Sequence, residues 1–315
     1  MKKFKNLFAL LLIFVLTFSL VACTIDDSSE PENIVENSNE TADIKFPLTI
    51  TDFLEREISL EKKPERIVSL APSTTELIYA LGAGDKIVGV TDYDNYPPEV
   101  ENIAKVGGFK GPNIEAITAQ NPDIILASNL SGQEEMETLE NMGIPVIMLE
   151  SKNIERIYES IELLGQITGM EENGEKIINE MKAKISEIND KVKELPKIDV
   201  FYLVSFEGNW TAGKGTFIDE LINLAGGNNI VEDIEGWTQY SVEELVKKDP
   251  DVIITSPHAG NIDDIEKTEG YQNTKAVKNG NIFVVSDDDI IARSSNRIVL
   301  GLEEIAKFLH PEVFD

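Results

Sequence analysis

Residues 67–90 read IVSLAPSTTELIYALGAGDKIVGV, and this stretch decides the fold class. It begins with a short apolar run, ends with a second one at residues 87–90, and carries a helical pattern between them. Ser73 and Glu76 have the spacing of a capping box, which predicts that the helix begins at Ser73. Gly82 follows its last apolar residue. Strand, helix and strand in this order predict a parallel α/β sheet.

The same alternation continues along the chain, with one interruption. Strands are predicted at residues 123–127 and 145–149, and again at residues 199–204, 251–255 and 282–285. Between residues 153 and 195 there is no strand pattern, and apolar residues recur every three or four positions up to Leu195. A helix of about 24 residues spans about 36 Å, the scale of a small domain. It is either a long surface helix or the connection between two lobes.

An internal repeat favours two lobes. The residues NIEAI at 113–117 and NPDIIL at 121–126 recur as SVEEL at 241–245 and DPDVII at 249–254, with the same spacing. A second match pairs Glu76-Leu-Ile with Glu220-Leu-Ile, in the same order. We therefore expect two lobes of one design with a cleft between them.

The first 46 residues do not resemble the rest. Three early lysines precede an apolar run at residues 7–22, which is typical of an export signal and short of the roughly 20 residues that span a bilayer. Leu20-Val-Ala-Cys23 resembles the lipobox of bacterial lipoproteins, which implies a lipidated Cys23; a plain signal peptide or an uncleaved anchor is the alternative. The acidic residues that follow cannot form a core. The expected organisation is a lipoprotein signal peptide at 1–22, an acidic flexible tether at 23–46, an N-terminal α/β lobe at 47–152, a connecting helical segment at 153–195 and a C-terminal α/β lobe at 196–315.

Composition excludes several functions. The formal net charge of −29 disfavours nucleic acid as a partner, because phosphates are bound by Lys and Arg. Two histidines and one cysteine cannot form a His/Cys metal cage or an internal disulfide. No Gly-x-Ser-x-Gly motif is present, and His258 and His310 are expected in a loop and at a helix end. The sequence thus predicts neither an enzyme nor a bound cofactor.

Aromatic residues gather where predicted strands end. Tyr93, Phe109, Trp210 and Trp237 are all expected in loops, and ligands of open α/β sheets bind beyond the carboxyl ends of strands. Such residues also anchor loops to a core. Because both tryptophans fall in such loops, a large, flat, partly apolar ligand is favoured.

Glu115 and Glu243 hold equivalent positions in the repeat, two residues after the expected N-caps Asn113 and Ser241. Negative charge in the first turn of a helix is favoured by about 0.3–1 kcal/mol, which alone could explain both.

Four segments resemble one family. They are PERIVSLAPSTTEL at 64–77, VGVTDYDNYPP at 88–98, VGGF at 106–109 with NIE at 113–115, and RSSNRIVLGL at 293–302. Over residues 47–315 the chain resembles the cobalamin and iron-complex substrate-binding proteins of ABC importers, and most of all their cobalamin-binding branch. The resemblance implies two Rossmann-like α/β lobes, one long connecting helix and a ligand cleft between the lobes.

The same resemblance implies a set of functional residues. The ligand-binding set is Tyr93, Phe109, Trp210, Trp237 and Arg293. It further implies that Glu115 and Glu243 dock onto the permease. The chain departs from the cobalamin-binding pattern at three places: Phe109 replaces a tryptophan, Ser128 stands where a second tryptophan is expected, and residues 287–289 contain an insertion.

We therefore expect a monomeric lipoprotein, anchored outside the cytoplasm, that delivers a corrinoid or related metal chelate to an ABC permease and its ATPase. A ferric-siderophore or haem binder is the alternative. Haem is disfavoured because no cleft motif offers an obvious His or Met ligand, and a catecholate siderophore would favour more cleft cations than Arg293 and Arg297. An exported enzyme or adhesion module is the competing class.

Overall fold

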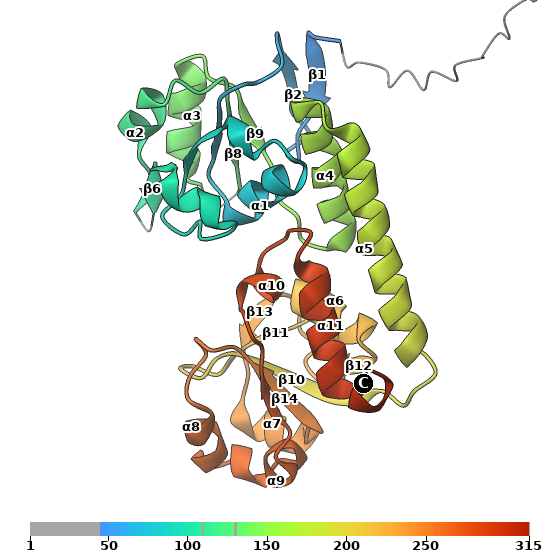
Figure 1. Ribbon diagram of the computed structural model, residues 1–315. Coiled ribbons are helices and arrows are strands. Elements are labelled where there is room, and N and C mark those ends of the chain that lie inside the picture. Colours follow the sequence, from blue (N-terminus) through green and yellow to red (C-terminus); the bar gives the residue numbers. More distant parts are fainter. Residues whose placement is uncertain (1–44, 109, 129–130, 315) are drawn as a thin grey trace, which may run out of the picture. The chain divides into compact units, whose positions relative to one another are not determined.

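A computed structural model describes residues 45–314, apart from Phe109, Asn129 and Leu130. The expected signal peptide, Cys23, all but the end of the expected tether, and Phe109 lie outside the described residues. Residues 43–315 form one compact unit, whose elements are drawn in Figure 1. Among the helices of the described part, none combines the length and apolar character needed to cross a membrane.

The N-terminal lobe begins with an antiparallel hairpin of β1 (Leu48–Thr51) and β2 (Glu57–Leu60). It is followed by a five-stranded parallel sheet of order β5-β4-β3-β8-β9. The strands are β3 (Ile67–Ser69), β4 (Ile87–Val90), β5 (Ala104–Lys105), β8 (Ile124–Ala127) and β9 (Val146–Met148). The fully buried runs of β3, β8 and β9 match what a sheet covered on both faces requires.

Helices α1 (Pro72–Ala80), α2 (Ile114–Ala119) and α3 (Gln133–Asn141) connect these strands. A small hairpin of β6 (Gly107–Gly108) and β7 (Gly111–Pro112) precedes α2. The expected capping box of α1 is wrong. Ala71 is the N-cap residue and makes no side-chain cap, and Pro72 occupies the first turn, a position that suits its missing N–H.

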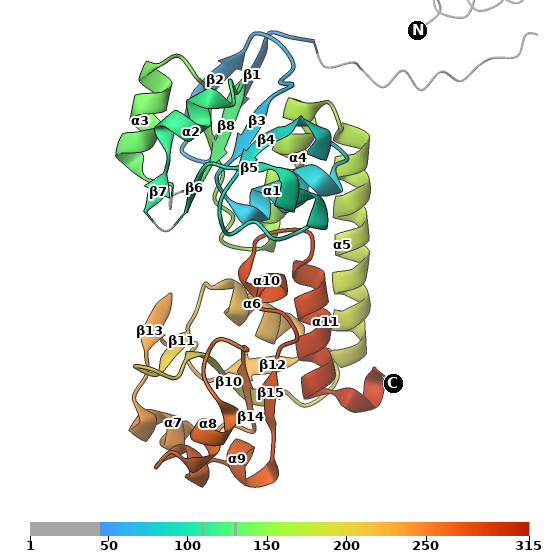
Figure 2. The same cartoon turned by 60° about the vertical axis from the view of Figure 1, so that its left-hand side comes forward.

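The segment between the lobes holds two helices, and the longer one is the expected long connecting helix. They are α4 (Ile154–Thr168) and α5 (Glu171–Val192), and Gly169 ends α4 in the left-handed conformation. The 22 residues of α5 correspond to about 33 Å. Helix α5 packs against α4 and also against α6 and α11 of the C-terminal lobe, as Figures 1 and 2 show.

The C-terminal lobe contains a second sheet of order β13-β11-β10-β14-β15, with β12 also paired to β10. Its strands are β10 (Ile198–Ser205), β11 (Trp210–Ala212), β12 (Gly227–Asn229), β13 (Trp237–Gln239), β14 (Val252–Thr255) and β15 (Ile282–Val284). Its helices are α6 (Phe217–Leu224), α7 (Val242–Lys248), α8 (Ile262–Lys267), α9 (Lys275–Asn279), α10 (Asp289–Ala292) and α11 (Ile298–Leu309). Strands β12, β14 and β15 run parallel to their neighbours, whereas β11 and β13 are antiparallel.

The predicted repeat is visible in the two sheets. The parallel order β3-β8-β9 of the first lobe returns as β10-β14-β15 in the second. The two-lobed parallel α/β fold is therefore confirmed.

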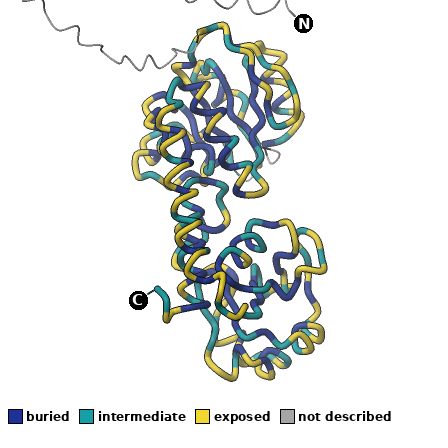
Figure 3. Tube along the Cα trace, turned by 90° about the vertical axis from the view of Figure 1, so that its right-hand side faces the viewer, coloured by how far each residue is buried: buried dark blue, intermediate teal, exposed yellow. Residues whose placement is uncertain are grey.

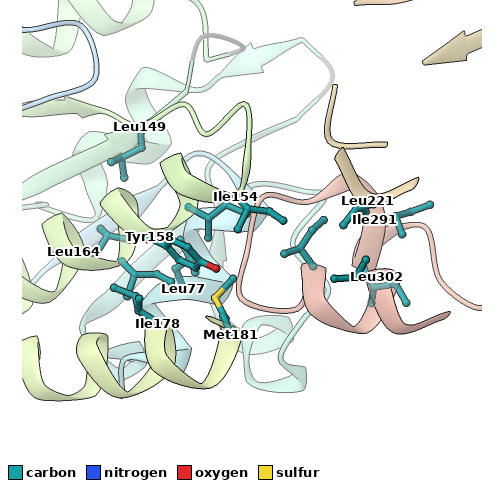
Figure 4. Close-up of a cluster of buried hydrophobic side chains, with 14 of the residues drawn as sticks. Leu77, Leu149, Ile154, Tyr158, Leu164, Ile178, Met181, Leu221, Ile291 and Leu302 are labelled. Atoms are coloured by element: carbon teal, nitrogen blue, oxygen red, sulfur yellow. The ribbon is translucent and has the colours of Figure 1, made fainter. Parts of the chain in front are cut away.

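One core cluster continues through the connecting helices (Figure 4). It includes Leu77 of α1, Tyr158 of α4, Met181 of α5, Leu221 of α6 and Leu302 of α11. Strands β3, β8, β9 and β14 are fully buried, and α5 alternates between buried and exposed residues, as the colours of the tube between the lobes in Figure 3 show. This alternation is the amphipathic pattern expected for residues 178–192.

Candidate functional site

A cavity of about 360 Å³ lies at the carboxyl ends of the parallel strands of the N-terminal lobe. Leu70 follows β3, Thr91 follows β4, Ser128 follows β8 and Leu149 follows β9, and all four line it. The side chains that leave these strand ends converge on one edge of the sheet, the usual place for a ligand in this architecture. The cavity lies at strand ends, where sequence analysis expects the ligand, although the sequence did not single out its serine hydroxyls.

The β6–β7 hairpin forms one wall of this cavity, through its glycines. A Cβ atom at Gly107 would lie 2.7 Å from the Cα atom of Pro112, and one at Gly108 would lie 2.1 Å from the Asp92 carboxylate. At Gly107, where the neighbour is backbone, only glycine permits this close approach, whereas the Asp92 side chain beside Gly108 can move. Phe109, which follows Gly108, lies outside the described residues.

Tyr93 and Arg293 are the two expected ligand-binding residues that the structure brings together. Both line the cavity, although Arg293 comes from the C-terminal lobe. Its Nη1 donates to Glu76 at 2.8 Å and to Asn95 Oδ1 at 2.7 Å, and its Nη2 donates to the carbonyl of Tyr93 at 3.1 Å. Nη2 also lies 3.0 Å from Asp289. The guanidinium is thus held by two carboxylates at the edge of the cavity.

Glu76 is the centre of this contact between the lobes. Its side chain is 1% exposed, and besides Arg293 it accepts from Ser295 Oγ at 2.6 Å and from Arg297 Nη1 at 3.2 Å. The carboxylate that the sequence assigned to a capping box therefore joins helix α1 to the segment after α10. A buried carboxylate needs such charged partners.

The three acids at residues 287–289 have three different partners. Asp287 pairs with Arg297 Nη2 at 2.9 Å, and Asp289 accepts from Asn95 Nδ2 at 3.0 Å in addition to its contact with Arg293. Asp288 instead bonds to Nδ1 of His258. Of these three acids, Asp289 is the one that contacts a residue of the cavity lining, because its partner Arg293 lines the cavity.

Sequence analysis predicted only that His258 lies in a loop. It follows β14, and its side chain is 86% exposed. The hydrogen bond to the Asp288 carboxylate raises the pKa of the imidazole. His310, in contrast, is buried at the end of α11, as expected for a helix-end residue, with Nε2 3.3 Å from the carbonyl of Gly226.

Trp210 and Trp237 begin short strands rather than lying in loops, so that part of the prediction is wrong. In the β11–β13 pair, Trp210 lies opposite Gln239 and Trp237 lies opposite Ala212, which puts the two indoles diagonally on one face. They are 41% and 56% exposed. Neither lines the cavity of the N-terminal lobe. In Figures 1 and 2 β11 and β13 lie on the side of their lobe nearer to the N-terminal lobe.

Glu115 and Glu243 are exposed and lie in the first turns of α2 and α7. The expected N-caps are confirmed: Asn113 Oδ1 accepts from the N–H of Ala116 at 3.0 Å, and Ser241 Oγ accepts from the N–H of Glu243 at 3.2 Å. The two acids thus occupy matched positions on the two lobes.

In the part of the chain that the structure describes, no group of three or more His, Cys, Asp or Glu side chains could hold a metal ion. The site offers instead a hydroxyl-rich cavity, an exposed aromatic pair and an ion-pair cluster between the lobes. This arrangement suits binding of an organic ligand.

Comparison with known proteins identifies the family. The model of the family described as periplasmic binding protein matches residues 67–289. The chain is 34% identical to an uncharacterized ABC transporter substrate-binding lipoprotein, YvrC, of Bacillus subtilis, over 100% of this chain and 99% of that one.

Two solved structures share the fold. One is the periplasmic vitamin B12 binding protein BtuF of Vibrio cholerae, with 30% identity, a TM-score of 0.70, and coverage of 79% of this chain and 98% of that one. The other, from Staphylococcus epidermidis, is described as a possible iron-binding (periplasmic solute-binding) protein and has 33% identity, a TM-score of 0.70, and coverage of 78% and 99%. The chain belongs to the periplasmic binding protein family and is a substrate-binding protein of an ABC transporter, not an enzyme.

Proposed function

We propose that this protein binds a corrinoid outside the cytoplasm and delivers it to an ABC permease. The observation that carries the proposal is the charge of the cavity. Among its described lining residues, Arg293 is the one cation, and its guanidinium already contacts Glu76 and Asp289. A cavity of this kind does not offer the unpaired cations that a polyanionic chelate needs.

The remaining lining suits the edge of a corrinoid. Thr91, Ser131 and Ser151 place hydroxyl groups on it. These hydroxyls already bond within the protein, Thr91 to Asp94, Ser131 to the N–H of Ser128 and Ser151 to Ser160, and their remaining lone pairs can accept from amide N–H groups of a ligand. A corrinoid carries amide groups around a largely apolar ring. The apolar part of the lining includes Leu70 and Leu149.

Size supports a ligand shared between the lobes. A volume of about 360 Å³ is at the lower end of small-molecule sites, so a corrinoid would extend beyond the cavity. Trp210 and Trp237 present exposed indoles on the other lobe, and indoles pack well against flat apolar surfaces. We propose that Tyr93, Phe109 and Arg293 contact one side of the ligand and the tryptophan pair the other.

Two further functional assignments belong to this proposal. The first is that Cys23 is lipidated and anchors the protein to the membrane. The second is that Glu115 and Glu243 meet basic residues of the permease, supported by their exposed, equivalent positions on the two lobes.

A ferric chelate is the second candidate ligand, favoured by the likeness to the Staphylococcus epidermidis protein described as a possible iron-binding one. Titration calorimetry and tryptophan fluorescence with cyanocobalamin, dicyanocobinamide, a ferric siderophore and haemin distinguish the two. The proposal requires corrinoid binding that quenches tryptophan fluorescence and raises the melting temperature, since a ligand of the native state stabilises it. Binding of the siderophore or haemin with no corrinoid signal would replace it by the iron-complex function.

A further inference from the structure

The internal repeat relates His258 to the N-terminal cavity. Residues 121–126 align with residues 249–254 of the repeat. When the same alignment is extended toward the C-terminus, Ser128 pairs with Ser256 and Ser131 pairs with Ala259. The structure supports this pairing, because the N–H of Ser131 donates to the carbonyl of Ser128 at 2.9 Å and the N–H of Ala259 donates to that of Ser256 at 3.1 Å. His258 is therefore in the C-terminal counterpart of a segment whose two serines line the cavity.

The position of His258 in the sheet agrees with this relationship. It follows the carboxyl end of β14, the strand that corresponds to β8, and Ser128 follows β8. Its partner Asp288 immediately precedes Asp289, which contacts Arg293 at the cavity and Asn95 of the N-terminal lobe. The imidazole thus belongs to the edge of the C-terminal lobe that bears the contact with the N-terminal lobe.

The imidazole is also oriented. Its Nδ1 bonds to Asp288 Oδ2, while the other oxygen, Oδ1, is buried and has no hydrogen-bond partner among the described residues. In the neutral ring an Nδ1–H that donates to a carboxylate leaves the lone pair on Nε2. Within the described part of the chain, Nε2 of His258 has no hydrogen-bond partner, and the side chain is 86% exposed. A carboxylate that orients a histidine in this way is the usual outer partner of a metal-binding imidazole.

From these observations we infer that His258 is an axial ligand for the metal of the bound chelate, with Asp288 as its positioning residue. The inference rests on the proposed corrinoid function and adds a residue that sequence analysis assigned to a loop. The step is a ligand exchange: the bond between cobalt and a water molecule breaks, the Nε2 lone pair forms a bond to cobalt, and the water leaves. Cobalt keeps its oxidation state, so no oxidant or reductant is needed.

Two forms of cobinamide test the inference with the full-length protein. Aquacobinamide has an exchangeable water on cobalt, whereas in dicyanocobinamide cyanide occupies both axial positions. The wild type should shift the visible absorption bands of aquacobinamide toward those that free imidazole produces. His258→Ala should abolish this shift and weaken aquacobinamide binding by about tenfold or more, the effect of about 1.4 kcal/mol. Affinity for dicyanocobinamide should be the same in wild type and variant.

Two further variants separate ligation from contact. Pro257→Ala alters the neighbouring exposed residue without removing an imidazole, and it should keep both the shift and the affinity. Asp288→Asn removes the carboxylate that orients the ring, and it should retain the shift but weaken aquacobinamide binding by about tenfold.

The outcomes are distinct. Binding of both cobinamides with an unshifted aquacobinamide spectrum, or a shift that persists in His258→Ala, would overturn the ligation and leave the corrinoid function standing. An equal loss of affinity for both cobinamides in His258→Ala would also overturn the ligation, because a contact between His258 and the ligand would explain it without a bond to cobalt. Failure of the wild type to bind either cobinamide would overturn the corrinoid function and the ligation together.

Discussion

Glu76 on helix α1 and Glu220 on helix α6 hold equivalent positions in the two lobes, and each accepts hydrogen bonds from residues outside its own lobe. Glu76 accepts from Arg293, Ser295 and Arg297 of the C-terminal lobe. Glu220 Oε2 accepts from the N–H of Ile154, the first residue of α4, at 3.0 Å. The Glu-Leu-Ile repeat thus supplies two contacts that fix the lobes to each other and to the connecting helices.

The first prediction is that Glu76→Gln destabilises the protein strongly. The amide keeps the shape of the side chain, but the partly buried guanidinium groups of Arg293 and Arg297 lose a shared counter-charge. Arg293 keeps Asp289 and Arg297 keeps Asp287, so the expected loss is that of charged hydrogen bonds, about 1.5–3 kcal/mol, and not that of a fully unpaired buried charge. Urea denaturation should show this loss, while Glu101→Gln, at an exposed position, should stay within about 0.5 kcal/mol of wild type. Equal midpoints for the two variants would contradict the role of Glu76.

The second prediction concerns pH and Glu220. Burial raises the pKa of this carboxyl above its ordinary value of 4.5. A raised pKa means that the stability from this group is present at low pH and is lost as pH rises through the folded-state value. Glu220→Gln keeps an acceptor for Ile154 and removes the charge. Its melting temperature should therefore exceed that of wild type at neutral pH, and the difference should shrink as the pH falls toward 4.5. A difference that stays constant with pH would refute the explanation.

The fold could be predicted from the sequence because its central strands are short, continuous apolar segments. The parallel strands that form the centres of both sheets, β3, β8, β10 and β14, are almost continuous apolar segments, and a run of this kind needs no partner to be recognised. Strands β11 and β13 were missed for the opposite reason. Each has three residues, and each depends on its neighbours: β11 pairs with β10 and β13, and β13 pairs with β11.

The site was predicted less completely, because its key contacts join residues far apart in the chain. Glu76 and Arg293 are separated by 217 positions, so local spacing favoured the wrong partner, Ser73. His258 and Asp288 are brought together only by the adjacent ends of β14 and β15. The repeat did contain a usable signal, since it aligns His258 with the segment between Ser128 and Ser131.

The third prediction addresses the tryptophan pair. Trp237→Ala should weaken binding of dicyanocobinamide by a few kcal/mol at most, as expected for one aromatic anchor. Dicyanocobinamide is used because its cobalt cannot accept a protein ligand. Leu54→Ala removes an equally exposed apolar side chain from the turn between β1 and β2 and should leave the affinity unchanged. An unchanged calorimetric affinity for Trp237→Ala would exclude this residue from the ligand site.

The fourth prediction concerns Cys23, which lies outside the described residues. If it is lipidated, Cys23→Ser should move the protein from the membrane fraction to the soluble fraction and leave ligand affinity unaltered. More than one acyl chain is needed for stable anchoring, so mass spectrometry of the wild type should find multiple acyl groups. Wild-type protein in the soluble fraction with an unmodified Cys23 would show that the chain is not a lipoprotein.

The last prediction separates docking from helix stabilisation at Glu115 and Glu243. Both acids are exposed and lie in first turns, where a carboxylate gains about 0.3–1 kcal/mol from the helix dipole. If the dipole is their whole role, changing both to Arg lowers the melting temperature and leaves uptake near normal. If they pair with basic residues of the permease, like charges now face each other and uptake of labelled cyanocobalamin is abolished, while calorimetric affinity is retained.

Glu172→Arg is the matched control, because Glu172 is an exposed acid in the first turn of α5 and is not part of the repeat. It should lower stability by a similar amount per site without reducing uptake. Because Glu115 and Glu243 belong to different lobes, each single change to Arg should reduce uptake partly and the two together should remove it. Uptake by the double variant at the level of the Glu172→Arg control would leave the helix dipole as the sufficient explanation for both acids.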